Sequence, residues 1–355
     1  VLGCEDALVR PQIMSGTNAL YLTLSALLKH GDTMISLSGA PYDSLQEMIG
    51  ISGNSSQSLK AYGVRYEQID LINDDFDDEK IVERLKQNNV KLVEIQRSRG
   101  YSHRLSLTLD KIERIIKKIR EVNKDVIIMI DNCYGELVEK QEPGHIGADV
   151  VVGSLMKNLG GGIASTGGYI AGNKDLIFVV AERLTAPGIG KDLGANFNLN
   201  NSFFKGIFMA PNAVKSALKT AVFSSYMLEK LGCKNVSPRY NEPRTDIIQT
   251  LELGTKENLV AWYPFNDTAD LGKDISGNEN HATAKGSTLP TIDEVAGRTA
   301  VTLHGGSYGA SYLELPKEIL KDVDDNGGFT VSTWIHGNKA SNVWERVFDF
   351  GNGMT

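Results

Sequence analysis

The 355-residue chain has few cysteines, no long apolar run and no excess of basic residues. Its three cysteines, Cys4, Cys133 and Cys233, form no CxxC pair and have no histidine at ligand spacing, which argues against a disulfide framework and a zinc site. No apolar stretch reaches the roughly 20 residues that a membrane-spanning helix needs. With 37 Lys and Arg against 44 Asp and Glu, the net charge is −7, so no general basic surface is expected for nucleic acid.

The first residues, VLGCEDALVR, lack an initiator methionine, a basic segment and an apolar segment. We therefore expect no secretory signal peptide, and we expect the N-terminus itself to be truncated. Thiols without a pairing pattern are typical of a reducing compartment. These features predict a cytoplasmic location for the N-terminal part of the chain.

Residue types are distributed unevenly along the chain. All three tryptophans follow residue 260, whereas all three cysteines precede residue 234. Up to about residue 250, apolar runs with strand character alternate with stretches of helical period. Strands are expected at 34–37, 91–95, 125–130 and 149–154, and helices at 16–30, 77–88 and 108–122. The alternation predicts an α/β fold of three layers, in which helices cover both faces of a mostly parallel sheet.

After about residue 258, short aromatic and β-branched runs are separated by Gly, Asn and Asp turns. The runs lie at 260–267, 299–305, 311–316, 329–337 and 344–353. They predict a partial all-β sandwich, which further strands would complete. No flexible linker precedes it. We therefore divide the chain into residues 1–257 and 258–355, and we favour an assembled or fragmentary reading frame over a natural fusion.

Five short motifs in the first part each supply a group that a pyridoxal-phosphate site needs. They are SGTNAL at 15–20, GAPYDSL at 39–45, IQRSRGYS at 95–102, IDNCYGE at 130–136 and GSLMKNLGGG at 153–162. Any one of these motifs is a weak indication of such a site, but the five motifs in this order are a specific one. The chain is therefore expected to be an enzyme, or part of one.

Lys157 and Asp131 are the candidates for holding the cofactor itself. Lys157 follows the strand expected at 149–154, so its amine can project at the carboxyl edge of the sheet, where ligands of open α/β sheets bind. There it could form a Schiff base with the cofactor, or it could be an ordinary surface lysine beside a glycine loop. Asp131 ends the apolar run VIIMID and could pair with the pyridine nitrogen, or it could cap a turn.

Ser15, Gly16 and Thr17 precede the helical pattern ALYLTLSALL, so the first N–H groups of that helix could bind a phosphate. Helix capping explains the serine or the threonine equally well. The glycine fits a backbone that must approach a ligand closely.

Arg97 and Arg99 follow the strand expected at 91–95, at the same edge of the sheet. A guanidinium there could bind a substrate carboxylate or a phosphate, and the alternative is a pair of surface arginines. We interpret Cys133 as a small buried residue below the cofactor rather than as a nucleophile. The glycines at 160–162 are interpreted as backbone that passes close to the cofactor or to a neighbouring subunit.

The order and spacing of the motifs resemble the large domain of fold-type I pyridoxal-phosphate enzymes, in the cystathionine and methionine γ-lyase superfamily. The closer resemblance, over roughly residues 1–257, is to the family of methionine γ-lyase-like or aluminum resistance proteins. ALVRPQ at 7–12, RLTAPGIGK at 183–191 and EPRTDIIQ at 242–249 carry it as well. The resemblance implies that Tyr42 stacks on the pyridine ring and that Ser154 helps to bind the phosphate. The alternative for Tyr42 is a packing tyrosine at a helix start.

The resemblance also implies the activity. It points to a pyridoxal-phosphate-dependent lyase that acts on a small sulfur-containing amino acid by β- or γ-elimination, with Lys157, Tyr42 and Asp131 as catalytic residues. Enzymes of this kind form homodimers or homotetramers. The family's N-terminal segment and smaller C-terminal domain are expected to be missing, so we expect a fragment that binds cofactor and turns over poorly.

Residues 258–355 resemble the first half of a laminin-G-like, concanavalin A-like jelly-roll domain, through AWYPFND at 261–267 and YLELP at 312–316. Such modules are usually extracellular, and the rival hypothesis is a protein that binds carbohydrate or matrix through this part. Asp267, Asp274 and Asn278 could ligate calcium, although turn chemistry explains them equally well. The unpaired cysteines and the five motifs favour the enzyme.

Overall fold

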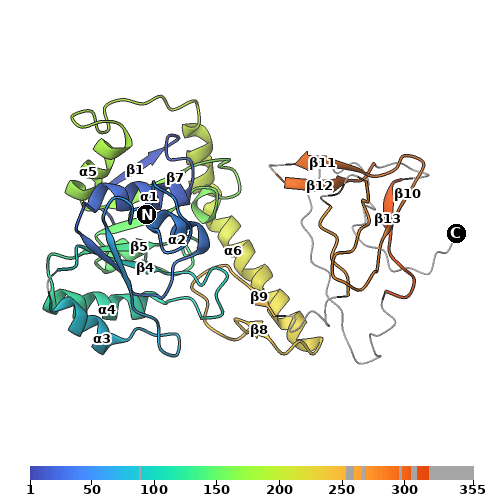
Figure 1. Ribbon diagram of the computed structural model, residues 1–355, viewed down its shortest axis with the longest axis horizontal. Coiled ribbons are helices and arrows are strands. Elements are labelled where there is room, and N and C mark those ends of the chain that lie inside the picture. Colours follow the sequence, from blue (N-terminus) through green and yellow to red (C-terminus); the bar gives the residue numbers. More distant parts are fainter. Residues whose placement is uncertain are drawn as a thin grey trace. The chain divides into compact units, whose positions relative to one another are not determined.

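The computed structural model describes residues 1–87, 89–252, 260–265, 267, 269–295, 298–304 and 310–319. The chain forms two compact units (Figure 1). The first comprises residues 1–229 and 236–250, and the second comprises 230–235 together with the chain from 251 onward. All five motifs lie in the first unit.

The first unit is built around a sheet of seven strands in the order β1-β7-β6-β5-β4-β2-β3. Their bounds are β1 (Asp6–Arg10), β2 (Thr33–Ser36), β3 (Arg65–Gln68), β4 (Leu92–Gln96), β5 (Ile127–Asp131), β6 (Val150–Ser154) and β7 (Gly168–Gly172). From β3 to β6 all neighbouring strands are parallel, whereas β7 is antiparallel to both β6 and β1. The prediction of a mostly parallel α/β sheet is confirmed.

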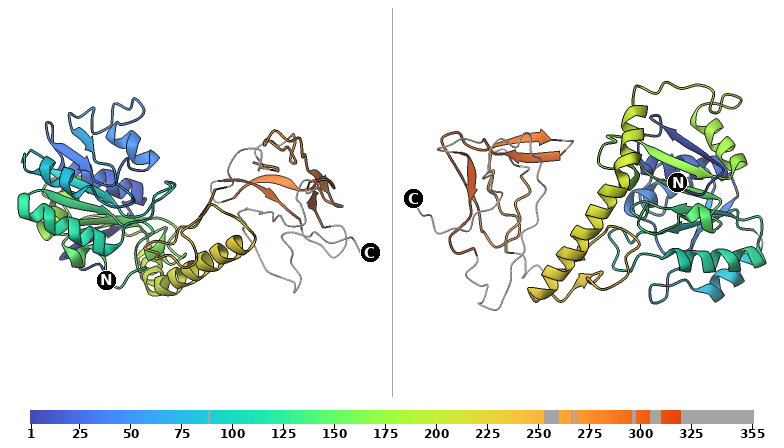
Figure 2. Two further views of the ribbon diagram at one scale, coloured as in Figure 1. Left: turned by 90° about the horizontal axis from the view of Figure 1, so that it is seen from below. Right: turned by 180° about the vertical axis from the view of Figure 1, so that it is seen from behind.

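Helices cover both faces of this sheet (Figure 2). One face buries the apolar sides of α1 (Gly16–Leu27), α2 (Asp43–Ile49) and α5 (Lys174–Leu184). The other face buries those of α3 (Asp78–Leu85) and α4 (Leu109–Val122). The three predicted layers are therefore present, and the helices expected at 16–30, 77–88 and 108–122 correspond to α1, α3 and α4.

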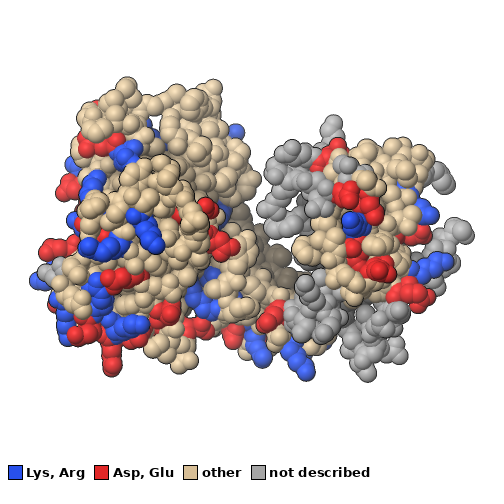
Figure 3. Space-filling model, viewed as in Figure 1, with Lys and Arg blue, Asp and Glu red and all other residues tan. Residues whose placement is uncertain are grey.

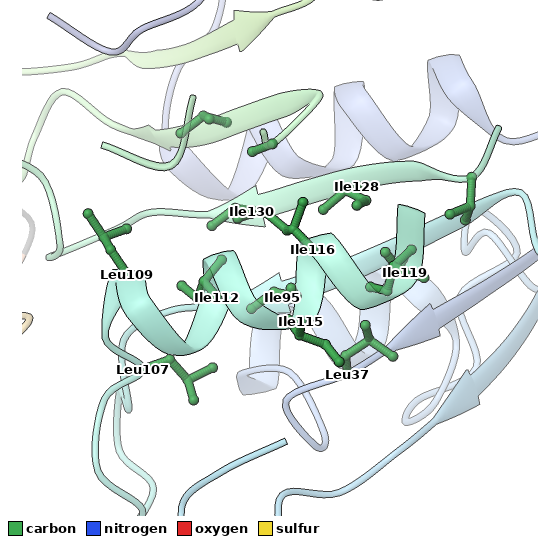
Figure 4. Close-up of a cluster of buried hydrophobic side chains, with 14 of the residues drawn as sticks. Leu37, Ile95, Leu107, Leu109, Ile112, Ile115, Ile116, Ile119, Ile128 and Ile130 are labelled. Atoms are coloured by element: carbon green, nitrogen blue, oxygen red, sulfur yellow. The ribbon is translucent and has the colours of Figure 1, made fainter. Parts of the chain in front are cut away.

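Helix α4 shows how the sequence determines this packing. Thr108 caps its N-terminus, because the threonine hydroxyl accepts a hydrogen bond from the Lys111 N–H at 3.3 Å. Four isoleucines at helical spacing then form one apolar face: Ile112, Ile115, Ile116 and Ile119. Figure 4 shows this face against the strand residues Ile95, Ile128 and Ile130, and all of these side chains are buried.

Strand alternation places polar residues together at one edge of the sheet. On β2, β4, β5 and β6, every second residue belongs to the apolar core beneath α1, as Met34, Leu92, Met129 and Val152 do. The same face therefore receives the polar residues near the carboxyl ends of these strands, namely Ser36, Glu94, Gln96, Asp131 and Ser154. Parallel strands end at the same edge, so this edge, under α1, is where a ligand would bind.

Helix α6 (Asn200–Lys230) is 31 residues long, contains Pro211 and was not expected from the sequence. One side of it is buried, with Gly206, Ala210 and Val214 among the buried residues. The remaining surface carries large apolar side chains that are exposed, including Phe204 at 71% and Phe208 at 80%. Beyond α6, β8 (Val236–Ser237) pairs with β9 (Thr250–Leu251).

The described residues of the second unit hold short strands. β10 (Thr283–Lys285) pairs with β13 (Tyr312–Glu314), and β11 (Thr291–Val295) pairs with β12 (Arg298–Thr302), both antiparallel. No strand forms over 260–265, where one was expected, and the runs at 329–337 and 344–353 lie outside the described residues. These separate two-stranded pairs do not make up the jelly-roll sandwich that was expected.

The calcium ligands expected in this unit are not supported. The carboxylate of Asp274 accepts hydrogen bonds from the N–H groups of Trp262, Ser276 and Asn280 and from the Ser276 hydroxyl, at 2.8–2.9 Å. Asp274 therefore organises a turn. Within the described part of the chain, no group of three or more His, Cys, Asp and Glu could hold a metal ion.

Acidic and basic side chains are interspersed on the face of the molecule in Figure 3. Several of them are paired around α3 and α4, as Arg114 is with Asp75 at 2.7 Å and Lys118 with Asp78 at 2.7 Å. Among the described helices, none has both the length and the apolar character that crossing a membrane requires.

Ile112→Ala should lower the free energy of unfolding by about 3 kcal/mol, because it removes buried methyl groups and leaves a cavity beneath α4. The matched control is Lys117→Ala, an exposed position on the same helix, which should change stability by less than about 0.5 kcal/mol. Urea denaturation followed by circular dichroism measures both. Equal effects of the two substitutions would contradict the proposed core.

Candidate active site

Asp131 lies at the mouth of the central strand β5. Its side chain is 2% exposed, and Oδ1 accepts a hydrogen bond from the Cys133 N–H at 3.0 Å. Burial raises the pKa of Asp131 above its ordinary value, and the neighbouring Lys157 ammonium opposes that rise. A cationic group at this edge of the sheet would therefore favour the charged form of the buried Asp131 carboxylate.

Lys157 follows β6 by three residues and immediately precedes the short 3₁₀ helix Asn158–Gly160. Its Nζ lies 4.0 Å from the centroid of the Tyr134 ring, a cation–π contact. Burial acts to lower the pKa of Lys157, but its acidic neighbours Cys133, Tyr134 and Asp131 together raise it above the ordinary value. The amine is therefore protonated here and must lose a proton before it can attack a carbonyl. It is not the free surface lysine that was the alternative.

The N-terminus of α1 lies against the end of β6. Ser15 caps the helix, since its Oγ accepts a hydrogen bond from the Asn18 N–H at 3.1 Å. A Cβ on Gly16 would lie 2.9 Å from the Ser154 Cβ and 3.3 Å from the Cys133 Sγ, so the glycine is needed for this close packing. Helix geometry leaves the Gly16 and Thr17 N–H groups without a partner inside the helix, beside the Ser154 side chain.

Tyr42 precedes α2 and is fixed from two sides. Its hydroxyl lies 3.0 Å from the Thr17 hydroxyl, and its N–H donates to Gln96 Oε1 at 3.0 Å. Burial raises the pKa of the Tyr42 phenol, and the charge of Asp131 contributes to the rise. Tyr42 is thus held by its hydroxyl at α1 and by its backbone at β4, the strand that neighbours β5.

Arg97 and Arg99 are both buried, so neither is the surface arginine that was the alternative. The Arg97 guanidinium donates to Asn132 Oδ1 at 2.7 Å, to the Gly135 carbonyl at 3.0 Å and to Glu139 at 2.6 Å. These contacts tie the loop that follows Asp131 to β4. Arg97 therefore acts on the site through that loop, as a positioning residue.

Arg99 is occupied by the protein in a similar way. It donates to the carbonyls of Ser102 and His103 and, at 2.8 Å, to the Ser237 hydroxyl. Nearby, Asp246 accepts hydrogen bonds from the hydroxyls of Ser98 and Ser106. These interactions hold residues 236–250 against the loop after β4. They also occupy N–H groups of Arg99 that a substrate carboxylate would need.

The glycines after Lys157 pack against the protein's own helix. A Cβ on Gly160 would lie 1.5 Å from the Leu155 carbonyl oxygen, and a Cβ on Gly161 would lie 2.4 Å from the Gly206 carbonyl oxygen in α6. Within the chain, the close neighbour of this loop is α6, and its approach to the cofactor or to a second subunit stays a prediction.

Sequence reasoning missed two buried glutamates near the site. Glu94 lies on the same face of the sheet as Asp131, and Glu136 accepts a hydrogen bond from the Tyr169 hydroxyl at 2.9 Å. Both are completely buried, and burial raises the pKa of each to about 8. The period of two within KLVEIQ would have placed Glu94 and Gln96 next to Asp131.

These residues fit pyridoxal phosphate. A buried carboxylate for the ring nitrogen, an amine for the aldehyde, free helix N–H groups with Ser154 for the phosphate, and Tyr42 for the ring all lie at one sheet edge. Cys133 is 7% exposed beneath them, as predicted for a buried residue.

The family of this chain follows from comparison with known proteins. A family model described as methionine gamma-lyase matches residues 1–296. The chain belongs to the methionine gamma-lyase family. It is therefore a member of a pyridoxal-phosphate-dependent family, and the match extends past residue 257, where the resemblance of the motifs was expected to end.

A curated relative is similar to about three quarters of this chain. YnbB of Bacillus subtilis, which is uncharacterized, is 41% identical over 263 residues, which cover 74% of this chain and 62% of YnbB. The chain thus spans less than two thirds of that relative's length.

Two solved structures are similar to this methionine gamma-lyase family member. Both are designated candidate cystathionine beta-lyases involved in aluminum resistance. The protein from Clostridium acetobutylicum is 38% identical, with a TM-score of 0.72 over 88% of this chain and 75% of that one. The protein from Listeria innocua is also 38% identical, with a TM-score of 0.70 over 79% and 71%.

Arg97→Ala should destabilise this methionine gamma-lyase family member by about 3–5 kcal/mol, because it removes the donor to Asn132 Oδ1 and the cationic partner of Glu139. Arg114→Ala is the control, since Arg114 pairs with Asp75 on the surface and should cost about 1 kcal/mol or less. Denaturant unfolding of both variants provides the comparison. A loss of less than about 1 kcal/mol for Arg97→Ala would show that the guanidinium is not structural.

Proposed function

We propose that this chain binds pyridoxal phosphate and acts as a carbon–sulfur lyase on a small sulfur-containing amino acid. The observation that carries the proposal is the pair formed by Asp131 and Lys157 at the ends of the adjacent strands β5 and β6. The charge of each group favours the charged form of the other, which reduces the free-energy cost of burying them. Pyridoxal phosphate requires such an acid and such an amine at a ligand-binding edge of the sheet.

Each residue of the site has a role in holding the cofactor. Lys157 Nζ would bind it covalently, Asp131 would pair with its ring nitrogen, and Tyr42 would stack on its ring. The Gly16 and Thr17 N–H groups and the Ser154 hydroxyl would bind its phosphate, while Ser15 keeps the helix start in place through its cap. When bound, the cofactor supplies an electron sink for negative charge at the substrate Cα.

The chain's own residues then move and hold protons. Once unprotonated and no longer bound to the cofactor, Lys157 Nζ would be the base that takes the proton from the substrate Cα. Asp131 would keep a proton on the ring nitrogen, because its carboxylate is buried and is stabilised by a cationic partner. Elimination breaks the carbon–sulfur bond, and its electron pair leaves with the sulfur.

The names of relatives support the substrate class. The family model is described as methionine gamma-lyase, and two similar structures are designated candidate cystathionine beta-lyases. Both reactions break a carbon–sulfur bond of an amino acid, at Cγ in the first and at Cβ in the second. We therefore propose elimination and leave its position, β or γ, to the assay.

Exposed apolar residues support a second proposal, that two copies of this chain associate through α6. Phe204, Phe208 and Phe223 are 71%, 80% and 63% exposed on this helix. Large apolar side chains that are exposed together often mark the sites where proteins associate. We commit to a second copy as the partner, in keeping with the homo-oligomers expected from the resemblance.

Several expectations from the sequence stay predictions. They are the division of the chain at residue 257, the cytoplasmic location and the low turnover of a truncated chain. The rival function, carbohydrate or matrix binding through residues 258–355, is not adopted, because the described strands there form only separate pairs.

Borohydride reduction of the chain with added pyridoxal phosphate should label Lys157, and Lys157→Ala should abolish the label. Asp131→Asn should weaken cofactor binding about tenfold to a hundredfold, because it replaces a charge-assisted hydrogen bond by a neutral one. Lys174→Ala, at an exposed lysine, is the control. Peptide mapping and spectral titration provide the measurements, followed by assays for released thiol and keto acid. Labelling of another lysine would refute the assignment.

Phe208→Glu should shift the chain from dimer to monomer in light scattering, because it places a charge in an apolar interface. Lys205→Glu, which changes the charge of the same helix at a polar position, should leave the dimer intact. A chain that is monomeric before any substitution would remove the second proposal and would leave the cofactor proposal as it stands.

A further inference from the structure

Glu94 is a charged residue type in an apolar strand. It lies in the middle of β4, opposite Met129 in the register of β4 and β5, and its side chain is 0% exposed. Its Oε1 has no hydrogen-bond partner, and its Oε2 lies 2.9 Å from the Ser36 hydroxyl. An ionised carboxylate in this position would be buried with one oxygen entirely unpaired.

The hydrogen bonds of Ser36 can be counted. Its hydroxyl lies 2.9 Å from Glu94 Oε2 and 2.6 Å from the Gly39 carbonyl oxygen, and a serine hydroxyl carries one hydrogen. A carboxylate and a carbonyl are both acceptors, so one hydrogen cannot satisfy both contacts. If Glu94 is a carboxylic acid, it donates to Ser36, Ser36 donates to Gly39, and both contacts are hydrogen bonds.

Two charged groups act on the pKa of Glu94 in opposite directions. Asp131, on β5, adds to the rise that burial causes, whereas Arg104, on the loop after β4, acts to lower the pKa. The Arg104 guanidinium is itself bound to the carbonyls of Gln96, Ser98 and Leu105. Tyr66, on β3, is a further titratable group, and its hydroxyl donates to Gln68 and also interacts with the Ser36 side chain. No group in this set forms an ion pair with Glu94.

We propose that Glu94 is a positioning residue that carries a proton at neutral pH and links β4 through Ser36 to the Gly39 carbonyl. Gly39 begins the GAPYDSL segment, and the Tyr42 N–H in that segment is bound to Gln96, two residues after Glu94. The segment is therefore fastened to β4 at both points. Burial raises the pKa of Glu94 to about 8, in agreement with the hydrogen count.

Two consequences rest on the proposed function. A neutral Glu94 leaves Asp131 as the charged carboxylate on this face, so a cationic ring nitrogen has one partner there. The hydrogen-bonded chain also holds the segment that carries Tyr42. Ionisation of Glu94 would break the chain at Ser36 and add a second negative charge beside Asp131.

Infrared spectroscopy of the full chain without cofactor tests the protonation directly. At pH 7 the wild type should show a carboxylic-acid carbonyl band that Glu94→Gln removes and that Glu83→Gln, at an exposed position, leaves. Glu136→Gln accounts for the separate band of the other buried glutamate. Ser36→Ala should shift the Glu94 band without removing it. Loss of carboxylate absorption instead of the acid band in Glu94→Gln, or no shift in Ser36→Ala, would overturn the proposal.

The pH dependence of the free energy of unfolding is a second test, and the proposal predicts its direction. The folded chain keeps the Glu94 proton up to about pH 8, whereas the unfolded chain releases it near the ordinary pKa of 4.5. Wild type should therefore lose stability relative to Glu94→Gln as the pH rises through this interval. A constant difference between the two would contradict the proposal.

If Glu94→Gln does not fold, a chain that keeps Glu94 still decides the question. In a Glu136→Gln chain labelled with ¹³C-glutamate, one side-chain carboxyl resonance, from Glu94, should still report a protonated acid at pH 7, and its absence would overturn the proposal. None of these readouts needs cofactor, so a failure of cofactor binding would refute the proposed function alone.

Discussion

The burial of the Asp131 carboxylate is the constraint on which the rest of the site depends. A charge at the end of an apolar strand is tolerated only with a cation and hydrogen-bond donors close by. Lys157 and the Cys133 N–H meet that need within the chain. Both loops that supply these groups are fixed in place. Hydrogen bonds from Arg97 hold the loop after β5, and packing against α6 holds the loop after β6.

Parallel strands turn this local requirement into a site. Because β2, β4, β5 and β6 share one direction, their polar final residues meet at one edge, and alternation puts them on one face. Helix α1 then brings its N-terminus to the same edge, at the distance that Gly16 permits. Under the proposed function, the phosphate, ring and aldehyde groups of one ligand would thus be bound by residues that are far apart in the sequence.

A mostly parallel sheet with helices on both faces could be predicted from the sequence, because apolar runs and helical periods depend on neighbours along the chain. Four expected strands and three expected helices are present. β3 was missed because RYEQ at the sheet edge has no apolar signal, and α6 because its pattern is apolar on more than one side. The roles of Arg97 and Arg99 were missed because their partners, such as Asn132 and Ser237, lie 35 and 138 residues away. No local pattern reports such pairings.

The contact between the glycine loop and α6 has a mechanical meaning. Gly160 and Gly161 touch Gly206 and Ala210 backbone to backbone, with no side chain between them to rotate or compress. A displacement of α6 must therefore be transmitted to the loop, and Lys157 stands at the start of that loop. The same helix exposes its phenylalanines on the outside. If two copies associate through these phenylalanines, as proposed, the contact would also bear on the position of the Lys157 amine.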